Sequence, residues 1–230
     1  MLGPVTRQTL ADQVVERLIE AIVIGEVATG SPISENEVAI RFGVSRGPAR
    51  EAIFRLEGKG LVTRAPHVGA QVVDLTLEDL RALFEMREAL EGMACGLAAV
   101  RMEETALRRL EATIAQHAEQ PEVASGQSYY QPGGDRDFHV GIAAASGNAR
   151  LIRMLASDVY DVMRVYRYRS ALTPGRAVAA LEEHRAILAA LRARDPAGAE
   201  QAMRAHIRAS WENTRETFRT GADLPRKEKP

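Results

Sequence analysis

The feature that most constrains the fold is a pair of short helix signals on either side of a tight turn, within residues 34–60. Ser34 and Glu37 form a capping-box pattern at the start of the first helix, and Gly43 ends it. Ser45 is expected to be the N-cap of the second helix. Two helices this short and this close in the sequence indicate a helix-turn-helix unit.

The segments on either side extend this unit. Apolar residues at helical spacing predict one preceding helix, which Gly25 closes: Leu10, Val14, Leu18 and Ile22. The stretch "LVTRAPHVGAQVV" predicts two short β-strands joined by a turn at Pro66–Gly69. Together these elements predict a winged helix-turn-helix domain over residues 1–73.

The rest of the chain shows no strand-like alternation. After a linker at residues 74–76, helical patterns are expected at about 77–100, 103–119, 134–146, 148–172, 175–194 and 196–219. We therefore expect an all-helical bundle of about six helices over residues 77–220 and a solvated tail over residues 221–230. The fold class is mostly α.

Composition narrows the setting of the protein. Apolar residues make up 46% of the chain and charged residues 27%, which is typical of a soluble globular protein. The single cysteine, Cys95, excludes intrachain disulfides, fits a reducing compartment and is expected in the core. No apolar stretch reaches the ~18–20 residues that span a bilayer, and the N-terminus lacks the features of a signal peptide. We expect a cytoplasmic protein with no membrane partner.

Local charge points to one partner of the first domain. The chain as a whole has a formal net charge of −1, yet residues 41–64 hold six basic and two acidic residues, a local charge of +4. Arg46 and Arg50 share one face at the start of the second short helix, where a recognition helix presents side chains to the major groove of DNA. The alternative is a solvated basic face. The turn and the following hairpin favour double-stranded DNA.

Four residues in the second half form a candidate metal site. Asp135 and His139 are four residues apart, so a helix carries both on one face. His184 and His206 each lie eleven residues from Asp195, the expected corner between two helices. In an antiparallel hairpin they would therefore lie level with each other. Imidazole and carboxylate ligands suit zinc above all, with nickel or manganese as alternatives. The alternative is four hydrogen-bonded interior residues.

The first domain resembles the reader domain of GntR-type bacterial transcription regulators. The resemblance rests on "ISENEVAIRFGVSRGPAREAIFRLEGKGLV" followed by "HVGAQVV", and it covers residues 10–73. It implies DNA contacts by residues of the short helices and of the wing: Asn36, Ser45, Arg46, Gly47, Arg50, His67 and Gly69. Family members often have threonine in place of Gly47 and arginine in place of Asn36.

The second half resembles the FCD effector domain of the FadR subfamily, in its VanR-like branch, over residues 77–217. The carrying motifs are D-x-x-x-H, then "EEH", then "AMRAHI". Metal-binding members of this class use one Asp and three His, which fall here on Asp135, His139, His184 and His206. The resemblance therefore implies a metal centre in an effector-binding and dimerisation domain, and it argues against a fatty acyl-CoA effector.

These patterns predict a homodimeric transcription regulator, a repressor in the first instance, that binds two-fold operator DNA and senses a small organic acid with the help of a metal. Arg87 is a candidate anchor for the carboxylate of the acid, and Asn213 is a further polar contact. The alternative for Arg87 is an internal ion pair with Glu91, one helical turn away. A sensor of the metal itself remains open, and so does a metal-dependent hydrolase, although the chain has no H-E-x-x-H motif. We expect no enzyme activity.

Overall fold

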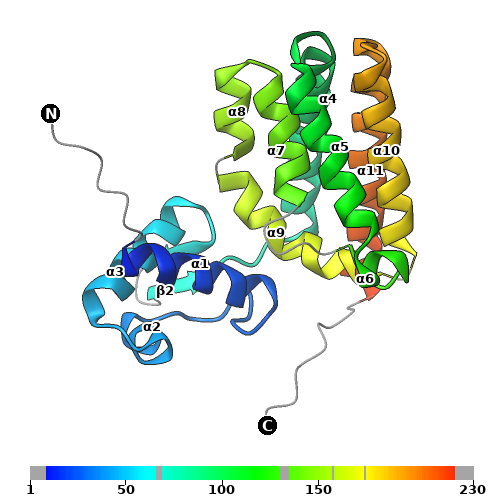
Figure 1. Ribbon diagram of the computed structural model, residues 1–230. Coiled ribbons are helices and arrows are strands. Elements are labelled where there is room, and N and C mark those ends of the chain that lie inside the picture. The colour runs from blue at the N-terminus through cyan, green and yellow to red at the C-terminus, as the bar shows by residue number, and fades with distance from the viewer. Residues whose placement is uncertain (1–8, 66–68, 130–134, 157, 174, 221–230) are drawn as a thin grey trace, which may run out of the picture. The chain divides into compact units, whose positions relative to one another are not determined.

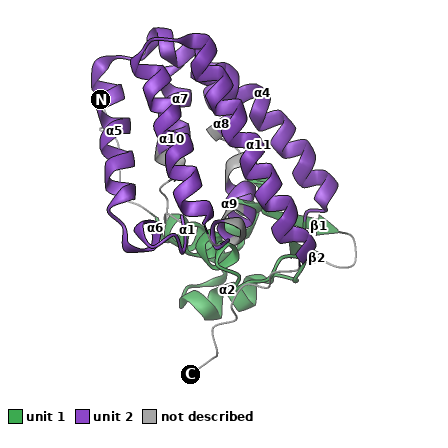
Figure 2. Ribbon diagram, turned by 90° about the vertical axis from the view of Figure 1, so that its right-hand side faces the viewer, with its two compact units in different colours: residues 1–74, 226–230 green, residues 75–225 purple. Residues whose placement is uncertain are grey.

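The chain folds into two compact units, up to Asp74 and from Leu75 onward (Figure 2). The structure is a computed structural model, and it describes residues 9–65, 69–129, 135–156, 158–173 and 175–220. No helix in these described ranges is long and apolar enough to cross a membrane.

The first unit contains three helices and a β-hairpin, labelled in part in Figure 1. Its elements are α1 (Leu10–Val23), α2 (Glu35–Phe42), α3 (Arg46–Gly58), β1 (Val62–Ala65) and β2 (Gly69–Val72). The two strands pair antiparallel, with Val62 opposite Val72. Pro32, in the segment that precedes α2, forms an isolated β-bridge with Gln71 of β2 and so joins this segment to the sheet.

Local sequence signals set the ends of these helices. The Ser34 hydroxyl accepts a hydrogen bond from the Glu37 amide at the start of α2, and the Glu37 carboxylate accepts one from the Ser34 amide. Gly43 ends α2 with a φ of 64°, a left-handed conformation that favours glycine. Ser45 is the N-cap of α3, as expected, although its side chain makes no capping hydrogen bond. The three helices bury Leu18, Leu56 and their neighbours in a small core.

The second unit is a helical bundle. Its helices are α4 (Leu77–Arg101), α5 (Glu104–Ala118), α6 (Pro121–Ala124), α7 (Asp135–Ala145), α8 (Ala149–Ala156), α9 (Asp158–Ala171), α10 (Arg176–Arg192) and α11 (Pro196–Thr220). In Figure 1, α4, α5, α7, α10 and α11 run alongside one another, and they pack through a shared core that includes Phe138, Ile187 and Met203.

All six long helical segments expected from the sequence are present, with two differences. The single turn α6 lies between the helical segments expected at 103–119 and 134–146, where no helix was expected. It forms because Pro121 occupies the first helical position and favours a turn of helix. The segment expected at 148–172 is covered by two helices, α8 and α9, on either side of residue 157, which is not described.

The corner between α10 and α11 is where the sequence places it. The Asp195 carboxylate accepts a hydrogen bond from the Gly198 amide, and Pro196 begins α11. A Cβ atom on Gly198 would lie 2.2 Å from a carboxylate oxygen of Asp195, so a larger residue there would displace the side chain that caps α11. The two helices then return side by side, which brings residues at equal distances from the corner to the same level.

Small residues let α4 approach α11 closely. A Cβ atom on Gly92 would lie 2.8 Å from Cγ of Arg204, and one on Gly96 would lie 3.1 Å from the carbonyl oxygen of Pro196. The neighbouring residue Glu91 is therefore carried into the interior between α4 and the helices beside it, where it is 6% exposed.

Candidate functional site

Three of the four candidate metal ligands meet in the interior of the helical unit. His139 comes from α7, His184 from α10 and His206 from α11, and all three are buried. One ring nitrogen from each lies within 4.8 Å of the others. The ring centroids of His184 and His206 are 4.6 Å apart, so the level arrangement expected from the corner at Asp195 is confirmed.

Each histidine uses Nδ1 for a hydrogen bond to another side chain. Nδ1 of His139 lies 2.5 Å from Glu91 Oε2, and Nδ1 of His206 lies 2.6 Å from Glu183 Oε2. Because carboxylates only accept hydrogen bonds, both of these nitrogens carry the proton. Nδ1 of His184 lies 2.9 Å from the Tyr129 hydroxyl. Nε2 of His139 and Nε2 of His184 are buried and have no hydrogen-bond partner among the residues that the structure describes.

The three partners are themselves held by a further residue each. Nε of Arg87 donates to Oε1 of Glu91 at 2.6 Å, within a buried ion pair. Both terminal nitrogens of Arg176 donate to Glu183 at 2.7 Å, a two-point contact that fixes the carboxylate plane. The Tyr129 hydroxyl also contacts Nδ1 of His117 at 2.9 Å. Each histidine ring is therefore oriented by a hydrogen-bond partner, and a second residue holds that partner in place.

The Arg87 guanidinium and the hydrogen bond from His139 keep Glu91 ionised despite its burial. Removal from water alone would raise the pKa of this carboxyl, but Arg87 and His139 oppose that effect and hold the pKa well below its usual range. The pair is therefore an ionic one, Arg87 with Glu91. This arrangement agrees with the alternative that the sequence left open for Arg87.

The donor set fits a divalent transition metal. Three neutral imidazoles are zinc ligands of the kind found in sites that keep an open coordination position, and nickel or manganese also accepts imidazole with carboxylate. Hydrogen bonds from the second ring nitrogen to a carboxylate or hydroxyl are the usual support of such ligands. Asp135 begins α7 one turn before His139, but its side chain lies outside the described residues.

The two candidate effector residues differ in position. Arg87 is 4% exposed and belongs to the network that supports His139, and its Nη1 has no hydrogen-bond partner among the residues that the structure describes. Its guanidinium lies over the ring of Phe84, 5.3 Å from the ring centroid. Asn213 is half-buried on α11, seven residues past His206 and therefore about 10 Å further along the helix.

The candidate DNA-contacting residues gather at the start of α2 and α3. Arg46 and Arg50 are exposed on α3 and reach back to α2, where Arg46 approaches Asn36 at 3.4 Å and Arg50 pairs with Glu35 at 3.0 Å. Gly47 is exposed between the two arginines, and a Cβ atom on it would meet nothing within 4 Å. This end of α3 therefore presents two cationic side chains and open space for a third contact.

The wing is only partly described. Gly69 opens β2 with a φ of 86°, a conformation that favours glycine, and pairs with Ala65. His67, the other wing residue expected to contact DNA, lies outside the described residues.

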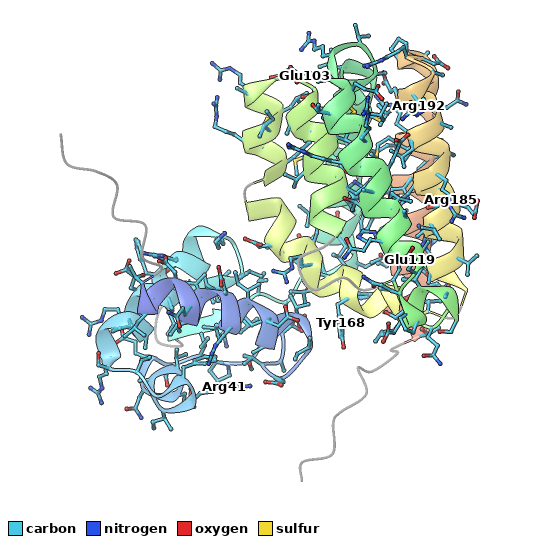
Figure 3. The ribbon with its side chains drawn as sticks, in the orientation of Figure 1. Arg41, Glu103, Glu119, Tyr168, Arg185 and Arg192 are labelled. Carbon is cyan, nitrogen blue, oxygen red and sulfur yellow. The ribbon has the colours of Figure 1, made fainter. Side chains whose placement is uncertain are left out.

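In the second unit the basic side chains of α10 include Arg185, which points outward from the bundle (Figure 3).

Several residues that contact the three histidines were not predicted. Glu183 directly precedes His184, but its contact is with His206 on the next helix. Tyr129 lies in a stretch without helical spacing, so no pattern indicated that it reaches His184.

Cys95 was expected in the core and is fully buried there. Burial, with Glu91 and Glu200 nearby, raises the pKa of its thiol to about 12.

Comparison with known proteins identifies both units. Residues 10–72 match the family described as "Bacterial regulatory proteins, gntR family", and residues 82–209 match the FCD domain. A "Probable D-xylose utilization operon transcriptional repressor" of Paenarthrobacter nicotinovorans is 34% identical over 212 residues, which is 89% of this chain and 88% of that protein. The "HTH-type transcriptional repressor RspR" of Escherichia coli K12 is 27% identical over 216 residues, 94% and 93% of the two chains.

Solved structures show the same fold. "E. coli McbR/YncC" superimposes with a TM-score of 0.75 at 22% identity, covering 93% of this chain and 99% of that one. A GntR regulator from Rhodococcus sp. RHA1 gives a TM-score of 0.68 at 23% identity, covering 93% and 98%. The families and relatives matched are transcription regulators and not hydrolases. The chain belongs to the GntR family of bacterial transcription regulators, with an N-terminal helix-turn-helix reader and a C-terminal FCD domain.

Proposed function

We propose that this regulator senses a small carboxylic acid through a divalent metal ion held by His139, His184 and His206, with Asp135 as the fourth protein ligand. The observation that carries the proposal is the support of the three rings: each buried imidazole is held at Nδ1, and Nε2 of His139 and Nε2 of His184 have no hydrogen-bond partner among the described residues. Zinc is the first choice, because it accepts three imidazoles and one carboxylate and can add a further ligand.

The charge of the site favours an anionic effector. Arg87 and Glu91 neutralise each other, and so do Arg176 and Glu183. A divalent ion together with one aspartate then leaves a net charge of about +1, which a carboxylate would balance. The buried Nη1 of Arg87 is a second donor for such a group, and Arg guanidinium matches carboxylate geometry.

The regulator is proposed to act as a homodimer on two-fold operator DNA. One reader unit supplies one recognition helix, and two-fold operators need two. We expect the helical unit to carry the dimer contact, so sedimentation of a 74–230 fragment should show a dimer, and a monomeric fragment would contradict this. The names of the two relatives described above favour repression over activation.

Effector binding must favour one of two states that differ in DNA affinity. A ligand shifts such an equilibrium only by the difference between its binding free energies for the two states. A shift of 5–150-fold in operator affinity, about 1–3 kcal/mol, is the usual range for such coupling. An acid that binds both states equally would leave operator affinity unchanged.

Fluorescence anisotropy with DNA from upstream of the gene tests the proposal. Carboxylic acids are first screened by thermal shift of the zinc-loaded protein, and the acid found is titrated against operator affinity with zinc and after EDTA treatment. The proposal expects the acid to change operator affinity only when zinc is present. A change caused by zinc alone, with no response to any acid, would instead favour the metallosensor, and an equal acid response in the metal-free protein would contradict the metal's role.

A further inference from the structure

The outward face of α3 carries a large aromatic side chain, Phe54, which is 71% exposed. Three- and four-residue steps separate Gly47, Arg50 and Phe54, so the three lie along one line of the helix. The opposite face of α3 is the one that packs into the core of the first unit, and its buried residues are Ala49, Ala52, Ile53 and Leu56. Phe54 therefore points away from the core, on the side of α3 that is open to a partner.

The neighbours of Phe54 on this face are cationic. A single exposed apolar residue is ordinary on a protein surface, so its exposure alone indicates nothing. Arg46 and Arg50 are also exposed, however, and Phe54 follows Arg50 by one helical turn. From Arg46 to Phe54 the helix rises by about 12 Å, at ~1.5 Å per residue. The major groove of DNA is also about 12 Å wide. A groove that receives the two arginines therefore receives the phenyl ring as well.

The acidic residues near this face have cationic partners of their own. Glu51 accepts a hydrogen bond from Arg55 at 2.6 Å. Glu35 pairs with Arg50 at 3.0 Å, and 71% of the Arg50 side chain is exposed in this pair. An ion pair so open to water contributes little stability, so Arg50 can exchange Glu35 for a group on DNA. The face thus offers a cation and an aromatic ring side by side.

The chemistry of the major groove restricts what a phenyl ring can contact there. Base edges present hydrogen-bond donors and acceptors, together with one apolar group, the C5-methyl of thymine. A phenyl ring neither donates nor accepts, so against a polar base edge it would remove water without replacing the lost hydrogen bonds. The thymine methyl carries no such cost, and its contact with the ring removes apolar surface from water.

We propose that Phe54 is a specificity-determining residue of the reader unit, whose ring packs against the C5-methyl of a thymine in each operator half-site. This inference rests on the expected role of α3 as the recognition helix. It adds apolar selection of one base to the polar contacts expected from Arg46 and Arg50.

Replacement of thymine by uracil tests the contact, because uracil lacks only the methyl group. A duplex is first selected from a random-sequence pool with the full-length protein, and each thymine of that duplex is then replaced singly by uracil. Fluorescence anisotropy should show at least one thymine in each half-site whose replacement weakens binding about fourfold, the factor that corresponds to one buried CH₂-sized group. Unchanged affinity at every position would overturn the proposal.

Variants of Phe54 show whether the ring is what reads the methyl. Phe54→Ala should weaken binding to the thymine duplex and should bind the uracil duplex equally well, a double-mutant cycle that isolates the contact. Phe54→Leu, which stays apolar, should keep a preference for thymine, and Phe54→Asn should lose it. The matched control is Val178→Ala, since Val178 is 48% exposed on α10 of the helical unit. It should behave as wild type, and a Phe54→Ala protein that still prefers thymine would overturn the proposal.

The double variant Arg46→Ala/Arg50→Ala on the same duplex separates this role from that of α3. Wild-type affinity in the double variant, or failure of the pool to yield a bound duplex, would refute both roles together. A weakened double variant beside a Phe54→Ala protein of wild-type affinity would refute the role of Phe54 alone. So would a weakened Phe54→Ala protein without a uracil-sensitive position, because the ring would then contact the sugar-phosphate backbone instead of a base.

Discussion

Replacing Arg87 by methionine should destabilise the helical unit strongly, because it leaves a buried carboxylate without its cation. Side-chain exposure is 5% for Arg87 and 8% for Glu91, and the two are joined at 2.6 Å. Removing one partner of a buried pair costs about 3–5 kcal/mol of unfolding free energy. For a unit of this size that corresponds to a fall in Tm of about 6–20 °C. Calorimetry of the EDTA-treated protein measures it.

Two further variants decide whether the uncompensated charge is the cause. Arg87→Met/Glu91→Gln removes the charge but keeps an amide oxygen for Nδ1 of His139, so it should be more stable than Arg87→Met alone. Arg81→Met is the matched control, since Arg81 pairs with Glu85 on the same helix at 2.9 Å with both side chains exposed. Its loss should cost at most about 1 kcal/mol. Similar losses in Arg87→Met and Arg81→Met would refute the reasoning.

Three further predictions concern the reader unit. Arg46→Ala/Arg50→Ala should weaken operator binding by about 1–3 kcal/mol for each lost base contact. Arg185→Ala, which changes an exposed arginine of the helical unit, should leave operator binding unchanged. Equal affinities of the two variants in gel-shift assays would mean that α3 is not the recognition helix. Gly47→Thr should tighten operator binding, because its Cβ atom meets nothing within 4 Å and its hydroxyl can reach a phosphate; unchanged affinity would show that the backbone amide already suffices. Hydrogen bonds from Thr9 and Arg55 lower the pKa of Asp12 from 3.8 to about 2. The stabilisation from ionised Asp12 is therefore present above pH ~4 and is lost as the pH falls to about 2. Asp12→Asn should flatten that part of the profile of melting temperature against pH.

Local signals in the sequence were sufficient for the secondary structure that positions the site. Capping residues such as Ser34 and Glu37 set helix ends through contacts with their own neighbours, which a sequence displays directly. The level placement of His184 and His206 followed from counting along two helices that meet at Asp195, because helical rise is constant. Such arguments succeed where the geometry is regular.

Contacts between distant elements were harder to predict. Glu91 was considered only as a partner for Arg87, and its second oxygen meets His139, 48 positions away. Tyr129 reaches His184 from an irregular segment, whose path depends on backbone contacts with Ala171 that no periodicity reveals. These supporting residues depend on how α4, α5, α7 and α10 pack, which is a property of the whole core.

The central claim is that His139, His184 and His206 hold one metal ion, and metal content after dialysis tests it most directly. Full-length protein is stripped with EDTA, equilibrated with zinc, dialysed and measured by elemental analysis, beside single alanine variants of the three histidines. His67→Ala, in the reader unit, is the matched control. We predict one zinc ion per chain in the wild type and in His67→Ala, and much less in each of the three variants. Zinc-free wild type, or equal zinc in all five proteins, would contradict the claim.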